Sequence, residues 1–184
     1  MEYFPSKNVF PLTTDVGRNG HLMLGGCDLA DLAKEFGTPL YILDEHDLRD
    51  RCRAFLGEFQ SRYTDTRVTY ASKAFTNIAV IKLLLEEGIG IEVVSGGELA
   101  AARAGGAPPS TVSFHGNNKS LNELTEAIEW GVGRIVIDNF HELEMLNQIT
   151  QKTGRVQDVM VRISPGVDPH THSYISTGTL DSKF

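Results

Sequence analysis

Hydrophobic and polar positions follow two periods along this chain and predict a series of strands and helices. Five short apolar runs occur after residue 66, namely RVTYAS, IGIEVVS, TVSFHG, RIVIDN and DVMVRISP. Between them, apolar residues recur at helical spacing in four stretches, residues 76–87, 97–106, 121–130 and 141–154. Apolar runs of this length are typical of strands that helices cover on both faces of a parallel sheet. The rhythm therefore predicts an α/β fold.

Residues at helix ends support this segmentation. Ser120 precedes LNELTEAIEW, and Glu123 three positions later completes a capping-box pattern. Gly88 is a suitable stop for the helix over residues 76–87. Near the N-terminus, Asp28 is suited to cap a helix over DLADLAKEF, which Gly37 would end.

The first third of the chain is less regular. Residues 1–20 are rich in turn formers, and we expect them to be irregular. HLMLGG and PLYILD are strand candidates, and a charged amphipathic helix is expected from about residue 45 to 62.

Composition narrows the class of protein. Hydrophobic residues make up 41% and charged residues 22% of the 184 residues, and the net charge of −7 argues against a nucleic-acid surface. The N-terminus lacks a signal-peptide pattern, and no apolar stretch is long enough to span a bilayer. Cys27 and Cys52 form no metal-binding pattern, so we expect free thiols in a cytoplasmic protein.

Polar residues follow each predicted strand at intervals of about 20 to 24 residues. They are Lys73, Ser95, His115, Asp138 and Arg162. In a (β/α)₈ barrel the carboxyl ends of the strands form the active-site face, and an open doubly wound sheet also binds ligands there. Loops are polar in any case, so this pattern alone leaves both folds open. The GxG at Gly131 and Gly133 precedes a strand, where a dinucleotide-binding fingerprint would follow one.

Lys73 allows two interpretations at this stage. Most lysines are solvated surface residues. A lysine at the end of a buried strand is also suited to form a Schiff base with an aldehyde cofactor.

Four segments carry a resemblance to a known family. YASKAF, IEVVSGGEL, FHGNNKS and RISPGVDPHTHSYISTGTLDSKF resemble diaminopimelate decarboxylases. YASKA alone is shared with relatives that act on ornithine, arginine or carboxynorspermidine, whereas FHGNNKS together with HTHSYISTG is more specific. GTPLYILDE and LRDRC are similar to the family's lead-in, so the resemblance runs from about residue 21 to the last residue.

The resemblance implies a fold and an activity. It implies the N-terminal part of a (β/α)₈ TIM barrel over residues 45–184, with residues 1–44 associated with a separate β domain. It also implies a pyridoxal 5′-phosphate enzyme that decarboxylates meso-2,6-diaminopimelate to L-lysine with release of CO₂, the last step of lysine biosynthesis. The family further implies a homodimer with shared active sites and a small amino-acid substrate, without a nucleic-acid or membrane partner.

The resemblance also implies site residues. Lys73 would hold the cofactor as a Schiff base, and Arg162 would lie beside its ring, although a structural ion pair remains the alternative for Arg162. His115 and Asn117 match FHGNNK and would line the pocket, although His115 is equally suited to a structural role in its loop. Ser95 is predicted to bind the cofactor as well.

Three features depart from the family pattern or stay open. Glu92 stands where much of the family has aspartate, so its role is undefined. His170 and His172 are spaced like metal ligands, but no further ligand supports a metal site, so a loop near the active site is preferred. The sequence ends inside a motif, before the family's phosphate loop and the acid at the pyridine nitrogen. We therefore expect residues 1–184 alone to be inactive.

Two rival functions use the same barrel. A racemase or cofactor carrier disagrees with FHGNNKS and STGTLDSKF. A non-catalytic homologue that regulates a partner disagrees with the retention of Lys73, although a regulator can keep that lysine.

Overall fold

The computed structural model describes residues 9–166. Contacts divide the chain into two compact units, Met1–Val68 and Thr69–Phe184.

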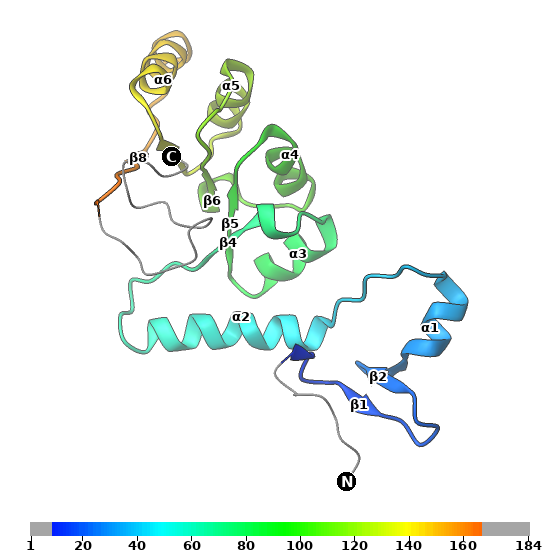
Figure 1. Cartoon of the computed structure of the whole chain (residues 1–184). Coiled ribbons are helices and arrows are strands. Elements are labelled where there is room, and N and C mark those ends of the chain that lie inside the picture. Colours follow the sequence, from blue (N-terminus) through cyan, green and yellow to red (C-terminus); the bar gives the residue numbers. More distant parts are fainter. Residues whose placement is uncertain (1–8, 167–184) are drawn as a thin grey trace. The chain divides into compact units, whose positions relative to one another are not determined.

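The N-terminal unit contains a small antiparallel sheet and two helices (Figure 1). Its strands are β1 (Asp15–Val16), β2 (Leu22–Leu24) and β3 (Cys27–Asp28), paired in the order β1-β2-β3. Helices α1 (Leu29–Phe36) and α2 (Glu45–Gln60) follow. The strand predicted in HLMLGG and both helices are confirmed. The prediction that residues 1–20 are irregular is wrong where β1 pairs with β2.

Both helices of this unit begin at an aspartate. Asp28 and Asp44 each accept hydrogen bonds from two backbone N–H groups of the helix that follows. A hydrogen bond from Asn19 is the main reason why the pKa of Asp28 lies at about 2. Gly37 ends α1 with a φ of 82°, a conformation that suits glycine. The predicted cap and stop of α1 are therefore confirmed.

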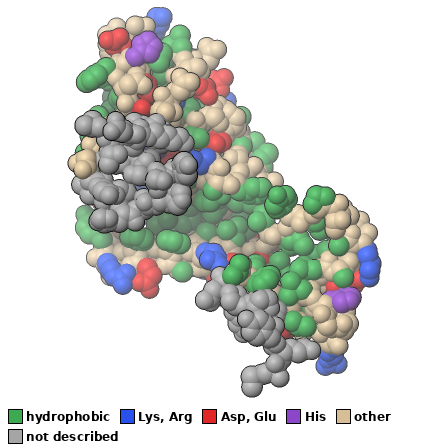
Figure 2. Space-filling model, viewed as in Figure 1, with side chains coloured by type: hydrophobic (Ala, Val, Ile, Leu, Met, Phe, Trp, Pro, Cys, Tyr) green, Lys and Arg blue, Asp and Glu red, His purple; other side chains and the backbone are tan. Residues whose placement is uncertain are grey.

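The strand predicted over PLYILD is wrong. Residues 39–44 form no strand, and the side chains of Tyr41 and Leu43 are 96% and 60% exposed. Apolar and aromatic residues favour strands only where a neighbouring strand or a packed layer receives them, and this segment pairs with neither. Hydrophobic side chains therefore remain visible on the surface of the N-terminal unit (Figure 2).

The second unit is a parallel α/β sheet. Its strands are β4 (Thr69–Ala71), β5 (Gly90–Val93), β6 (Val112–Phe114), β7 (Arg134–Ile137) and β8 (Val159–Val161). They pair in chain order, β4-β5-β6-β7-β8, and every pair is parallel. The connections contain α3 (Ile78–Glu86), α4 (Gly96–Ala104), α5 (Leu121–Trp130) and α6 (Phe140–Thr153), with short 3₁₀ turns η2 (Ser72–Ala74) and η3 (Pro109–Thr111). The predicted parallel α/β fold is confirmed.

The core lies on one face of the three central strands. Strand register places Ile91 beside Val112, and Val93 beside Phe114, which in turn lies beside Ile135. All five side chains are fully buried. Since α3 and α4 contact β5 while α6 contacts β7, this is the face that the helices cover.

The edge strand β8 departs from the expectation that every strand is buried. Val159, Met160 and Val161 are all exposed. β8 pairs only with β7, and β4 only with β5, so the sheet of the described residues is not closed into a ring. An edge strand has a neighbouring strand on one side only. The apolar sequence of β8 therefore did not predict burial correctly.

Candidate cofactor-binding site at the carboxyl ends of the strands

The five predicted strand-end residues lie along one edge of the sheet. Lys73 follows β4, and the other four follow β5 to β8 in order, namely Ser95, His115, Asp138 and Arg162. Parallel neighbours place their carboxyl ends at the same edge. The predicted common placement is therefore confirmed.

Lys73 lies in η2, a turn whose backbone is held on both sides. The hydroxyl of the buried Ser72 lies 2.7 Å from the carbonyl oxygen of Glu92 and 2.7 Å from Oε2 of Glu98. The hydroxyl of Thr76 donates to the Ser72 carbonyl at 2.7 Å. The Lys73 side chain itself is exposed. The turn thus presents the solvent-exposed amine of Lys73 on a backbone that hydrogen bonds hold in place.

His115 extends the pairing of β6 with β5. Its backbone N–H donates to the carbonyl of Val93 at 2.8 Å. Because side chains alternate along a strand, His115 lies on the face opposite Phe114, the face that also carries Glu92. Nδ1 of His115 is 3.6 Å from Oε1 of Glu92. Nε2 is buried and has no hydrogen-bond partner among residues 9–166, which is unusual for a buried polar atom.

Arg162 forms an ion pair with Asp138. The Nη1 atom lies 3.4 Å from Oδ1, and the two side chains are only 20% and 14% exposed. The backbone N–H of Arg162 donates to Ile137, so strand pairing continues past the end of β8. By the same alternation, both charges lie on the face that carries Glu92 and His115. The structural alternative for Arg162 is therefore present, but a guanidinium has five N–H donors and can serve a ligand as well.

Ser95 is the N-cap of α4. Its hydroxyl accepts a hydrogen bond from the backbone N–H of Glu98 at 3.3 Å. The carboxylate of Glu98 accepts from the Val94 N–H at 2.8 Å and also contacts Ser72. Ser95 thus has a structural task, and its hydroxyl hydrogen remains available for another acceptor.

Sequence reasoning missed a buried ion pair beside this edge. Nζ of Lys119 lies 2.9 Å from Oε1 of Glu142, with both side chains almost fully buried. The ammonium also donates to the carbonyls of Gly116 and Val136. The sequence marks Glu142 only as a helix-start residue, three positions after Asn139, the N-cap of α6, and gives no sign of its pairing with Lys119.

The two lysines at this edge differ in availability. Lys119 is committed to two carbonyls and a carboxylate inside the protein. Lys73 is exposed. Only Lys73 is therefore placed to react with a carbonyl group, because an amine must be accessible to attack one.

Other candidate chemistry finds no support in the described part of the chain. Residues 9–166 contain no group of three histidine, cysteine, aspartate or glutamate side chains arranged for a metal ion. None of their helices has the length and apolar character of a membrane span. His170 and His172 lie outside the described residues.

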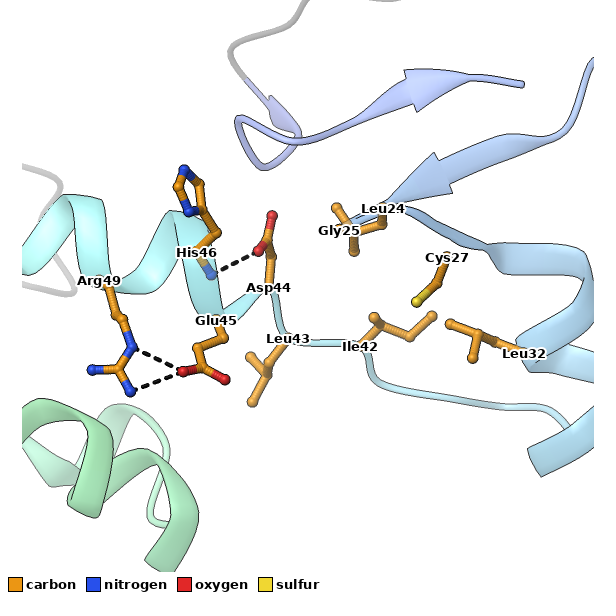
Figure 3. Close-up of a pocket in the computed structure, with 10 residues that line it drawn as sticks. All are labelled: Leu24, Gly25, Cys27, Leu32, Ile42, Leu43, Asp44, Glu45, His46 and Arg49. Atoms are coloured by element: carbon orange, nitrogen blue, oxygen red, sulfur yellow. Dashed lines mark hydrogen bonds and ion pairs between the residues drawn. The ribbon is translucent and has the colours of Figure 1, made fainter. Parts of the chain in front are cut away.

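The described residues line cavities in each unit. One of about 540 Å³ lies in the N-terminal unit, where Figure 3 shows Asp44 accepting from the His46 backbone and Glu45 paired with Arg49. It contains none of the strand-end residues. Another, of about 250 Å³, lies between the loops after β6 and β7 and is lined by Asn117, Asn118, Lys119, Ser120, Asn139, His141, Glu142 and Met145.

A comparison with protein families identifies the family of the chain. The model of the pyridoxal-binding domain of pyridoxal-dependent decarboxylases matches residues 45–184. The chain belongs to the pyridoxal-dependent decarboxylases.

Individual relatives agree with the family assignment. The diaminopimelate decarboxylase of Bacillus subtilis is 48% identical over 172 residues, which are 94% of this chain and 39% of that protein. That of Synechocystis is 43% identical over 189 residues, 98% of this chain and 40% of that protein. The chain thus spans about 40% of the length of the curated relatives that it matches.

Solved structures of this family have the same fold. The diaminopimelate decarboxylase of M. jannaschii in complex with L-lysine is 33% identical, with a TM-score of 0.83 over 94% of this chain and 41% of that one. The Helicobacter pylori enzyme, also with L-lysine, is 30% identical, with a TM-score of 0.77 over 85% of this chain and 39% of that one.

The described residues fit a pyridoxal cofactor. An accessible amine on a fixed turn matches the need for a covalent link to an aldehyde. The unpartnered Nε2 of His115 and the guanidinium of Arg162 share one face at the same edge. These groups could donate hydrogen bonds to a polar ring, and the cofactor would supply an electron sink for the carbanion that a decarboxylation leaves.

Proposed function

We propose that this chain is the N-terminal part of an enzyme that decarboxylates meso-2,6-diaminopimelate to L-lysine with release of CO₂, the last step of lysine biosynthesis. One observation carries the proposal. The curated diaminopimelate decarboxylases are 43–48% identical to nearly the whole chain. Two solved relatives hold L-lysine, which is the product of this reaction.

Lys73 has the central role in the proposed mechanism. Its exposed amine would hold the cofactor through the cofactor's aldehyde group, and the bound cofactor would supply the electron sink for decarboxylation. After the carboxylate has left as CO₂, Lys73 or another acid returns a proton to the carbon. The hydrogen bonds of Ser72 and Thr76 hold the backbone of η2 during both steps.

The remaining strand-end residues bind and orient the cofactor. We assign to Arg162 a hydrogen bond to an oxygen of the ring or substrate, with Asp138 fixing the guanidinium. His115 contributes the buried Nε2, with Glu92 near its Nδ1. Ser95 contributes its hydroxyl hydrogen from the N-terminus of α4, where partial positive charge favours an anionic group.

The proposal extends to assembly and location. The resemblance supports a cytoplasmic homodimer whose two active sites share residues between subunits. It also supports a division at residue 44, before the family match begins at residue 45. The boundary between the compact units falls later, after Val68.

The test uses the complete decarboxylase, meaning a chain that contains these residues together with the remainder that the relatives have. CO₂ release from meso-diaminopimelate is measured in the presence of pyridoxal phosphate, with L-ornithine and L-arginine as competing substrates. We expect turnover of meso-diaminopimelate alone and L-lysine as the product. Preference for ornithine or arginine would replace the proposed substrate, and racemisation without CO₂ would replace the reaction.

A further inference from the structure

Three consecutive helices of the second unit begin with the same four-residue pattern. The sequences SGGE, SLNE and NFHE each place a capping residue three positions before a glutamate. In every case the capping side chain accepts a hydrogen bond from the backbone N–H of that glutamate. The glutamates are Glu98 in α4, Glu123 in α5 and Glu142 in α6.

Each of these carboxylates contacts the connection that precedes its own. Glu98 accepts from the hydroxyl of Ser72, in the turn after β4. Glu123 accepts from the backbone N–H of Gly96, after β5, at 2.7 Å. Glu142 pairs with Lys119, after β6. The carboxylates therefore link neighbouring connections in series along the edge that carries the site.

The third link differs because it buries two charges. Lys119 and Glu142 have side chains only 1% and 2% exposed. Removing two charges from water costs more than a buried pair commonly regains, so well-packed apolar residues can replace such a pair without loss of stability. Stability alone therefore gives no reason for a charged link here.

The contacts of Lys119 show what the pair accomplishes. Its ammonium contacts the carbonyl of Gly116 in its own loop, the carbonyl of Val136 in β7 and the carboxylate of Glu142 in α6. The contact with Gly116 closes residues 116–119 into a ring, and the other two fasten that ring to the next strand and helix. The ring begins directly after His115, at a glycine whose φ of 111° suits no other residue well.

We propose that Lys119 and Glu142 form a positioning pair that holds the loop after β6 in the shape required to present His115 and Asn117 to the cofactor. The pair acts through the loop and does not touch the cofactor. This inference rests on the proposed site, but not on the identity of the substrate.

The first experiment replaces both charges in the complete decarboxylase with apolar residues of similar size, K119M together with E142L. We expect the thermal unfolding midpoint to change little, because the core stays filled. Amide hydrogen exchange in residues 115–119 should become faster. The cofactor dissociation constant should rise by about tenfold, which is the lower end of the loss seen when groups that support a ligand-binding residue are removed. The exposed pair Arg62–Glu58 supplies the matched control, R62M with E58L. This control should change neither the hydrogen exchange of residues 115–119 nor the cofactor dissociation constant.

A second variant separates position from charge. E142Q keeps the size of the side chain but removes the negative charge that pairs with Lys119, so it should lose cofactor affinity as E142L does. Unchanged loop exchange and cofactor affinity in the folded double variant would overturn the proposal, as would full cofactor affinity in E142Q. Both readouts are taken without substrate. A wild-type enzyme inactive on meso-diaminopimelate would therefore disprove the proposed function and leave this inference intact.

Discussion

The turn after β4 and the loop after β6 each place a lysine at the same edge of the sheet, in opposite environments. Around Lys73, the protein fixes the backbone through Ser72 and leaves the amine exposed. Around Lys119, the protein surrounds the amine with oxygen atoms and leaves Asn117 and Asn118 exposed. We infer that the surroundings of a lysine, more than its place at a strand end, decide whether its amine is accessible for reaction or is held inside the protein.

Removal of Lys73 should have the largest effect. K73A eliminates the exposed amine, so the covalent link to the cofactor should disappear, and turnover should fall by about 1,000-fold or more because attachment and proton return are both lost. Borohydride reduction followed by peptide mapping measures the link, and CO₂ release measures turnover. Recovery of the label on Lys119 in the wild type would reverse the roles assigned to the two lysines.

Truncation of Lys119 should mainly reduce stability. K119A leaves the carboxylate of Glu142 buried without its counter-charge, which costs about 3–5 kcal/mol in the free energy of unfolding. Urea denaturation measures the loss. K73A should show no comparable loss, because its side chain is exposed. Equal destabilisation by the two alanine variants would contradict the comparison.

Loss of the hydroxyl of Ser72, the residue before Lys73, should have a moderate effect. S72A leaves the carbonyl of Glu92 and the carboxylate of Glu98 without this partner, at a cost of about 1–3 kcal/mol. The rate of cofactor attachment should fall, because η2 is held less firmly. Stopped-flow absorbance of the apoenzyme mixed with pyridoxal phosphate checks the rate. T76V tests the other side of the turn, and an unchanged rate in both variants would show that η2 needs neither bond.

The smallest predicted effect is a dependence of stability on pH. Burial raises the pKa of Glu123. Hydrogen bonds from the Ser120 and Gly96 N–H groups and the Ser120 hydroxyl, with the charge of Lys119, outweigh burial and lower the pKa below its ordinary value of 4.5. A lowered folded-state pKa contributes stability that is present above 4.5 and is lost as the pH falls through the folded value.

E123Q removes this contribution. The wild type should therefore exceed E123Q in free energy of unfolding at neutral pH, and the difference should shrink as the pH falls below about 4.5. Urea denaturation across that range measures it. A difference that is constant with pH would mean that the carboxylate's charge has no part in the link to Gly96.

Much of the second unit was predictable because its signals are local. Apolar runs set the strands, and Ser120 with Glu123 marked the start of α5. A parallel order then follows from the strand–helix rhythm, and with it the common edge of Lys73, His115 and Arg162. Sequence reasoning succeeded wherever one βα unit contained all the information.

The predictions failed where the outcome depends on contacts between βα units or on whether a segment has a neighbouring strand among the described residues. PLYILD has the composition of a strand but no neighbour to pair with, and β8 lies at an edge where apolar residues stay exposed. The Lys119–Glu142 pair joins positions 23 residues apart, and the motif containing Lys119 gives no sign that its ammonium turns inward. The cofactor roles of Lys73, Ser95, His115 and Arg162 remain predictions.

The serial links also bear on how the sheet is built. Each glutamate joins a connection to the one synthesised just before it, so every link can close as soon as one further helix has left the ribosome. Such nearest-neighbour coupling resembles that of repeat proteins, in which folding propagates from one unit to the next. The second unit is thus suited to assemble in chain order, from β4 towards β8. Pulse-labelled hydrogen exchange should show β5 and β6 protected before β7, and simultaneous protection would exclude this order.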